Sequence, residues 1–221
     1  MEKCGVAGYL MEEGWKARES LDFAKSEFLL NEAKSLFEEL EDWHNVTECL
    51  NHLAYLYKVK AFNDIKKASD CVSNSLRLCA QKKKDNTLSL RAASSIYKYA
   101  GEFEKAEKYL SEFIESQKNP AARGDMRGDL AYNYMRRGNL PKAKEEIELA
   151  IKELNEGWEK ERMPHKMIWK TKLLMFKSLI FYNDGKIKDA KILAEQALAL
   201  SKEHNLKMRT QEAQNLVTIF S

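Results

Sequence analysis

The sequence predicts an all-α protein, a solenoid of about five helix hairpins followed by one capping helix. Three observations lead to this prediction. The 221 residues include only 9 Gly and 3 Pro, so few residues interrupt long helices. Apolar residues make up 44% of the chain and charged residues 32%, which is typical of a folded, well-solvated protein rather than a disordered one. A helix–turn–helix pattern also recurs along the chain, and such repeats are typical of stacked hairpins.

The repeat is clearest in residues 97–114, 134–151 and 181–198. Each segment has an aromatic residue, a glycine four positions later, an apolar residue two after that and an alanine three further on. Glycine suits the residue just past a helix, because it adopts the left-handed conformation without strain. A small alanine is expected where the two helices of a hairpin approach closely. The repeat-defining residues are Gly101, Ala106, Gly138, Ala143, Gly185 and Ala190.

The second helix of each pair is expected to begin at Phe103, Leu140 or Ile187. Asn139 can cap its helix through its side chain. Pro141 suits the first helical turn, where the N–H that proline lacks would have no partner.

Two weaker copies lie upstream, in residues 28–40 with Ala33 and in residues 53–76 with Tyr57 and Ala68. The linker of the second copy is two residues longer than the others and has no glycine. We therefore expect one domain over residues 1–221. Its predicted helix pairs span approximately residues 12–41, 44–80, 86–118, 121–157 and 160–204, with a capping helix at 206–220.

In their aromatic, glycine, alanine and second-helix apolar positions, these segments resemble the tetratricopeptide repeat (TPR) family over roughly residues 15 to 205. Successive repeat alanines, from Ala33 to Ala190, are 35, 38, 37 and 47 residues apart, longer than the 34-residue TPR period. The length resembles the long-period variants of bacterial and archaeal regulators, kinesin light chains and soluble NSF attachment proteins. The resemblance implies a right-handed superhelix and a scaffold that binds other proteins.

The 47-residue step places extra residues around 157–165. One interpretation is that the helix ends are extended and the connecting loop is packed, with Pro164 starting the next helix. The other is a docking loop, because Trp158, Met163 and Trp169 are large apolar residues and long connections are often functional.

The resemblance also implies that the first helices of successive pairs line a concave groove. Met and the hot-spot types Tyr and Arg are frequent at the positions that would point into it. We expect a protein or peptide partner, helical or extended, with acidic and apolar residues. Alternatively, Met175 and Tyr99 are core residues that pack between neighbouring helix pairs. The candidate groove residues are Asn51, Tyr55, Arg91, Lys98, Tyr99, Tyr132, Met135, Arg136, Met175 and Tyr182.

Some TPR domains hold acidic C-terminal tails of heat-shock chaperones with a clamp of Lys, Asn and Arg. The equivalent positions here include Asp125 and Asp129. Two carboxylates would repel the carboxylate of such a tail, so no chaperone-tail binding is expected.

Charge and composition argue against other classes of function. The 37 basic and 34 acidic residues give a net charge of +3, and Lys82, Lys83 and Lys84 form a short run typical of a solvated helix end rather than a nucleic-acid surface. The N-terminus has no apolar signal-peptide region, and no apolar run is long enough to span a bilayer. No nucleic-acid or membrane partner is therefore expected.

Sites for chemistry are not apparent in the sequence either. None of the four cysteines shows C-x-x-C spacing, so we expect reduced thiols and a cytoplasmic protein. The four histidines lack metal-ligand spacing, and there is no phosphate-binding loop or nucleophile elbow. No catalysis, cofactor or metal is expected.

A protein–protein interaction scaffold is thus the leading functional prediction. One alternative is a peptide-responsive regulatory or sensor module that acts in trans on a transcription regulator or ATPase. Another is a self-associating structural repeat protein. We expect a monomer or a weak homodimer.

Overall fold

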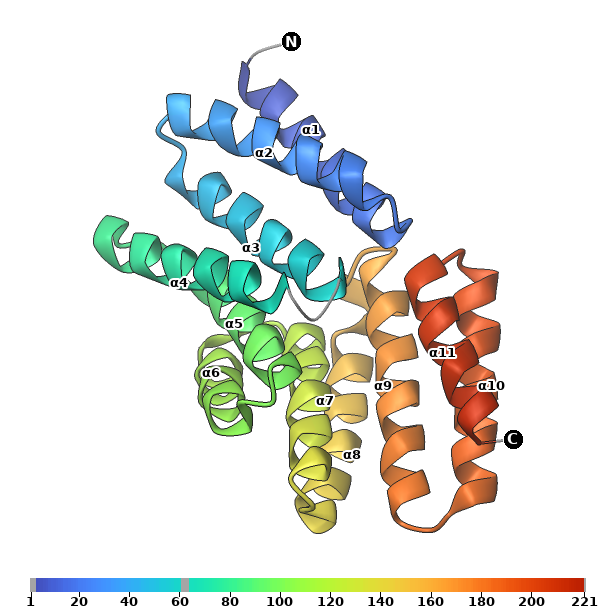
Figure 1. The fold of residues 1–221 in the computed structure, drawn as a ribbon. Coiled ribbons are helices and arrows are strands. Elements are labelled where there is room, and N and C mark those ends of the chain that lie inside the picture. The colour runs from blue at the N-terminus through green and yellow to red at the C-terminus, as the bar shows by residue number, and fades with distance from the viewer. Residues whose placement is uncertain (1–2, 61–63, 221) are drawn as a thin grey trace. The chain divides into compact units, whose positions relative to one another are not determined.

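The computed structural model describes residues 3–60 and 64–220, which contain eleven α-helices and no strand. All but the last helix follow one another as five pairs (Figure 1). The chain divides into two compact units, Met1–Tyr109 (unit 1) and Leu110–Ser221 (unit 2). The helices are α1 (Lys3–Glu19), α2 (Phe23–Glu39), α3 (Trp43–Lys60), α4 (Ile65–Lys82), α5 (Thr87–Tyr99), α6 (Phe103–Ser116), α7 (Pro120–Arg136), α8 (Leu140–Glu156), α9 (His165–Asn183), α10 (Ile187–Glu203) and α11 (Lys207–Ile219).

The turns inside the last three pairs have the backbone conformation that their glycines predict. Gly101, Gly138 and Gly185 have φ angles of 80°, 79° and 79°. In the first pair the same left-handed region is occupied by Leu21, with φ of 65°. A non-glycine residue in this conformation explains why the repeat pattern is weaker there. The longer linker predicted for the second pair falls on residues 61–63, which lie outside the described residues.

Helix starts also follow from local sequence. Phe103, Leu140 and Ile187 are the first residues of α6, α8 and α10, as predicted. The side chain of Asn139 accepts a hydrogen bond of 3.2 Å from the backbone N–H of Lys142, which caps α8. The first pair begins at Lys3, earlier than the residue 12 expected from the repeat pattern.

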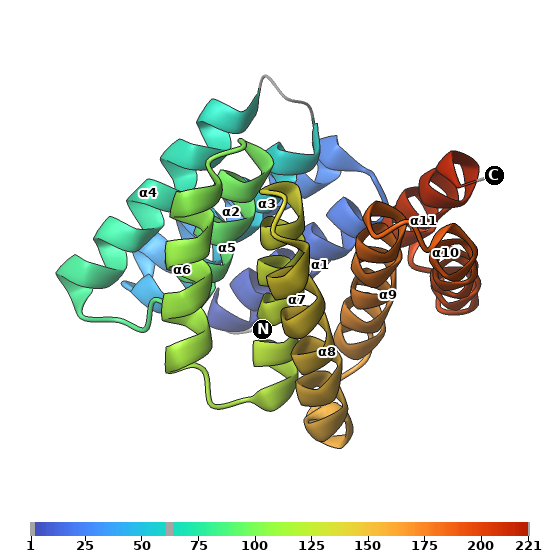
Figure 2. The same cartoon turned by 90° about the horizontal axis from the view of Figure 1, so that it is seen from below.

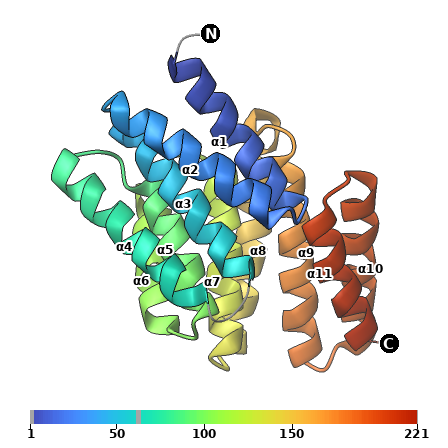
Figure 3. The same ribbon diagram turned by 45° about the horizontal axis from the view of Figure 1, so that its top comes forward.

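Unit 1 is built on small and apolar residues facing each other across its helices. Gly14 of α1 lies against Leu30 of α2, where a Cβ atom would come within 2.8 Å of the Leu30 side chain. Figure 3 shows α1, α2 and α3 following one another in this unit. Buried residues of these three helices form one cluster, consisting of Ala7, Ala33, Phe37, Val46 and Cys49.

In unit 2, α7 packs against both α8 and α9 (Figure 2). Two glycines of α7 allow this close packing. A Cβ atom on Gly124 would come within 2.5 Å of the carbonyl oxygen of Ala150 in α8. A Cβ atom on Gly128 would come within 2.1 Å of Leu173 in α9. A larger residue at Gly124 would meet the backbone of α8 and force the helices apart, whereas one at Gly128 would require the Leu173 side chain to move.

The last helix, α11, packs on α9 and α10 with one apolar face. Ala213 lies in a cluster with Met175 and Ala197, and Phe220 lies in another with Ala190 and Ala194. A polar outer face is what a terminal helix of a repeat array needs for solubility. The exposed polar residues of α11 include Lys207, Gln211, Gln214, Asn215 and Thr218.

The long connection between α8 and α9 is an ordered segment containing a short 3-10 helix, η2 (Trp158–Lys160). The first residue of the connection, Gly157, packs closely on α7. A Cβ atom on Gly157 would come within 2.4 Å of the backbone nitrogen of Ala121. The Glu161 carboxylate accepts a hydrogen bond of 3.1 Å from the side-chain amide of Asn119. Pro164 precedes α9 as its N-terminal cap residue rather than starting the helix.

Candidate functional site

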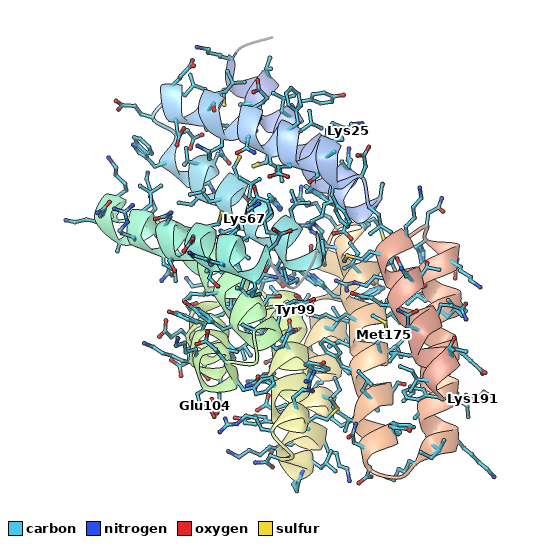
Figure 4. All side chains as sticks on the ribbon, viewed as in Figure 1. Lys25, Lys67, Tyr99, Glu104, Met175 and Lys191 are labelled. Carbon is cyan, nitrogen blue, oxygen red and sulfur yellow. The ribbon has the colours of Figure 1, made fainter. Side chains whose placement is uncertain are left out.

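In unit 1 the candidate groove residues belong to α3 and α5 and differ in exposure. Asn51 on α3 is buried, at 3% exposed. Tyr55, Arg91 and Lys98 are half-buried. Tyr99, at the end of α5, is 47% exposed, so it is a surface residue rather than a core residue (Figure 4).

Two cations flank the ring of Tyr55. The Arg18 guanidinium of α1 lies 5.3 Å from the ring centroid, and the Lys58 ammonium lies 5.0 Å from it. The Lys58 ammonium also donates a hydrogen bond of 2.8 Å to the hydroxyl of Ser95 on α5. Repeat spacing did not single out Arg18, because the first pair has no clear repeat pattern. Three successive first helices thus contribute polar groups beside one aromatic ring.

The side-chain amide of Asn51 forms no hydrogen bond with the residues that the structure describes, through either its nitrogen or its oxygen. Asn51 and Tyr55 are four residues apart on α3, so they share a face of the helix. A buried amide with neither atom paired is rare in native proteins. This makes Asn51 the most unusual polar group on the predicted binding face.

In unit 2 an aromatic pair joins α7 to α9. The rings of Tyr132 and Phe176 stack with centroids 4.7 Å apart. Arg136, which is exposed, donates a hydrogen bond of 2.9 Å to the Tyr132 hydroxyl. Phe176 was not among the predicted groove residues, although it lies next to Met175 in the sequence. Stacking across two helices is a tertiary contact that repeat spacing does not reveal.

The remaining predicted residues of unit 2 are placed differently. Met135 is 8% exposed, and its sulfur accepts a hydrogen bond of 3.6 Å from Asn183. Met175 is 4% exposed and belongs to the core between α9, α10 and α11 (Figure 4). Tyr182 is 39% exposed, and its ring stacks on Phe220. Met175 therefore has the core role that the sequence left open, and Tyr182 is the accessible residue.

A buried charge cluster lies beside Phe176, whose ring centroid is 5.8 Å from the Lys172 ammonium. The Lys172 ammonium of α9 is 2.6 Å from a carboxylate oxygen of Asp125 and 2.6 Å from one of Asp129, both on α7. It also donates a hydrogen bond of 3.1 Å to the backbone carbonyl of Asp125. Lys172 is thus held by the two carboxylates that were expected to repel an acidic tail.

Among residues 3–60 and 64–220, no group of three His, Cys, Asp or Glu residues could hold a metal ion. All four cysteines are free. Burial raises the pKa of the Cys49 thiol to about 12, so this thiol stays protonated at neutral pH. In the same described residues, no helix is both long and apolar enough to cross a membrane.

Paired helices, left-handed turns and close alanine contacts define a helical repeat protein. No protein-family model and no curated protein sequence matches the chain. Solved structures do match it. BtubC (BKLC) from P. vanneervenii is similar, with a TM-score of 0.59 and 18% identity over 92% of this chain and 91% of that one. A Podosopora anserina protein described as a kinesin light chain with nearly identical TPR-like repeats is similar, with a TM-score of 0.56 and 16% identity over 92% of this chain and 98% of that one. The chain therefore has the TPR-like helical repeat fold.

Proposed function

We propose that this protein is an interaction scaffold that binds a peptide or helical segment of a partner protein on the faces of its first helices, without catalysis. TPR-like repeat proteins in general act as such scaffolds. The observation that carries the proposal is the buried, unpaired amide of Asn51 beside Tyr55.

The amide of Asn51 is chemically suited to a peptide backbone. It has one acceptor oxygen and a donor nitrogen, which match the N–H and carbonyl of an extended segment. Tyr55, on the same face, offers an aromatic surface, and the cations Arg18 and Lys58 beside it favour acidic residues in the partner. Both amide atoms are buried in the free chain, so a partner would form hydrogen bonds with them once the side chains that cover them move on binding.

The face of α7 and α9 in unit 2 supports the same role. Tyr132, Phe176 and Arg136 combine stacked rings with an exposed guanidinium. Tyr and Arg are the residue types that most often dominate binding energy at interfaces.

The proposed compartment is the cytoplasm, in keeping with the four free thiols.

The test is affinity purification with mass spectrometry on the whole chain. Asn51→Leu replaces the unpaired amide by an apolar group of similar volume, so it should fold with equal or higher stability but lose partners. Tyr132→Ala/Arg136→Ala should lose partners that use the face of unit 2. Asn31→Ala, an exposed change on α2, is the control and should retain them.

An unchanged partner list in both variants would refute binding on the first-helix faces. The connection at residues 157–165 would then be the expected docking segment. Loss of partners together with loss of folding, detected by circular dichroism, would show that the residue is structural.

A further inference from the structure

The connection between α8 and α9 brings two lysines to one indole ring. The ammonium nitrogens of Lys166 and Lys170 lie 5.1 Å and 5.3 Å from the ring centroid of Trp158. Both lysines belong to the first two turns of α9. Neither forms an ion pair with any residue in the described parts of the chain. Two ammonium groups thus lie at the Trp158 ring without a salt bridge to any described residue.

This arrangement is electrostatically unfavourable in the free chain. Like charges four residues apart on a helix repel each other. Cations in the first turns also face the positive end of the helix dipole, and α9 has no acidic residue in its first turn. Attraction to the indole ring compensates in part. A negatively charged group placed between the two ammonium groups would relieve the repulsion.

The residues close to Trp158 in the sequence indicate what kind of anion fits. Met163, in the same connection, is 51% exposed and offers an apolar contact. Glu156 and Glu159 are exposed on either side of Trp158 in the sequence, and Lys160 and Arg162 are exposed just after it, so acidic residues interrupt the positive region and keep it small. A nucleic-acid strand needs a continuous basic stripe. One carboxylate beside an apolar side chain matches the small positive region and Met163.

We propose that Trp158, Met163, Lys166 and Lys170 form a second docking site, for an acidic segment of a partner protein in which a carboxylate lies next to an apolar side chain. The ammonium groups donate hydrogen bonds to the carboxylate, and Met163 contacts the apolar side chain. This site uses the first two turns of α9 and the connection before it, and it does not depend on Asn51, Tyr55 or Tyr132.

The experiment is an NMR titration of the full chain, in which the indole N–H signal of Trp158 is assigned by its loss in Trp158→Phe. The probe is an acetylated and amidated peptide of alternating glutamate and leucine. A lysine–leucine peptide of the same length and a single-stranded oligothymidylate are the comparison ligands. We expect saturable shifts of the Trp158 indole signal with the glutamate–leucine peptide alone.

The decisive variant is Lys166→Ala/Lys170→Ala, which removes repelling charges and should fold at least as well as the natural chain. Its Kd for the acidic peptide should rise about tenfold or more. Lys118→Ala/Lys188→Ala makes the same charge change at exposed positions of unit 2 and should leave the Kd unchanged. Asn51→Leu should also leave it unchanged, which separates this site from the first-helix faces.

Three results would overturn the proposal. The first is an absence of Trp158 shifts with the acidic peptide. The second is an equal rise in Kd for the two lysine double variants, since binding would then reflect overall charge. The third is an equal or stronger response to oligothymidylate, which would assign the patch to nucleic acid.

Discussion

The ammonium nitrogen of Lys172 on α9 lies 2.6 Å from a carboxylate oxygen of Asp129 on α7, inside unit 2. Lys172 is 8% exposed and Asp129 is 6% exposed, while Asp125, the second carboxylate, is fully buried. The carboxylates of Asp125 and Asp129 thus both contact the Lys172 ammonium in a site that is largely buried from solvent. This contact ties neighbouring helix pairs together and has consequences for both stability and binding.

Lys172→Met should destabilise unit 2 strongly, because it removes the ammonium group that both buried carboxylates contact. Breaking a buried ion pair in this way costs about 3–5 kcal/mol. Urea unfolding followed by circular dichroism measures the loss. Adding Asp125→Asn and Asp129→Asn to Lys172→Met should recover most of it, since the carboxylates that Lys172 contacts are then neutral amides. A loss below about 1 kcal/mol in the single variant would contradict the buried cluster.

A chaperone C-terminal peptide should not bind to this protein. The clamp-equivalent positions carry the carboxylates of Asp125 and Asp129, and the cation nearest to them, Lys172, is already bound to both. Isothermal titration calorimetry with such a peptide should give no measurable heat of binding. Binding that is lost in Arg91→Ala would contradict this prediction.

Gly138→Ala should lower the free energy of unfolding by about 1–2 kcal/mol, because an alanine is strained in the left-handed region. Nothing lies within 4 Å of the position that its Cβ atom would take, so the effect is conformational and not a clash. Gly138→Asn should cost less, since asparagine tolerates this conformation. Gly5→Ala, inside α1 and equally unobstructed, should instead stabilise the protein by up to about 1 kcal/mol. Thermal unfolding of the three variants tests the contrast, and equal melting temperatures would refute it.

Glu48→Gln should make the protein more stable at neutral pH. Burial raises the pKa of Glu48 above its ordinary value, with Asp42 acting in the same direction and His44 against it. A raised folded-state pKa favours folding at low pH, and this contribution is lost as the pH rises through that pKa. The glutamine imitates the protonated acid, so its advantage should be present at about pH 7 and vanish towards about pH 4.

Thermal unfolding of Glu48→Gln across this pH range is the measurement. Glu32→Gln, at an exposed position of α2, is the control and should show no comparable advantage at neutral pH. A Glu48→Gln advantage that grew on acidification would contradict the predicted sign.

The four thiols should react at very different rates with a thiol reagent. Cys4 is exposed, whereas Cys49 and Cys79 are buried, and burial also raises the pKa of Cys49 to about 12. At about pH 8 in the folded protein, Cys4 should be labelled first and Cys49 only on unfolding. Peptide mass spectrometry after timed labelling with iodoacetamide gives the order. Cys4→Ser should remove the fast phase.

Much of the fold could be predicted because its signals are local. The left-handed turn at Gly138 and the cap at Asn139 depend on residues only a few positions apart, so a single stretch of sequence reveals them. The turn at Leu21 has the same left-handed conformation without a glycine, and the first pair therefore showed only a weak pattern.

The candidate site could be predicted less well, because exposure depends on packing between distant helices. Met175 occupies a position that repeat geometry directs into the groove, but α10 and α11 cover it. Arg18 and Phe176 were missed because they meet Tyr55 and Tyr132 across helices, and no fixed sequence spacing encodes those contacts.

The sequence by itself determined the helix pairs, their turns and the small residues at their contacts, since helical periodicity and backbone preference act over a few residues. Only the tertiary structure decided which polar groups are buried and which are paired. It joined Lys172 to Asp125 and Asp129, left the amide of Asn51 unpaired and brought Lys166 and Lys170 to Trp158. These outcomes depend on desolvation and on distances between helices, which arise only when the helices pack.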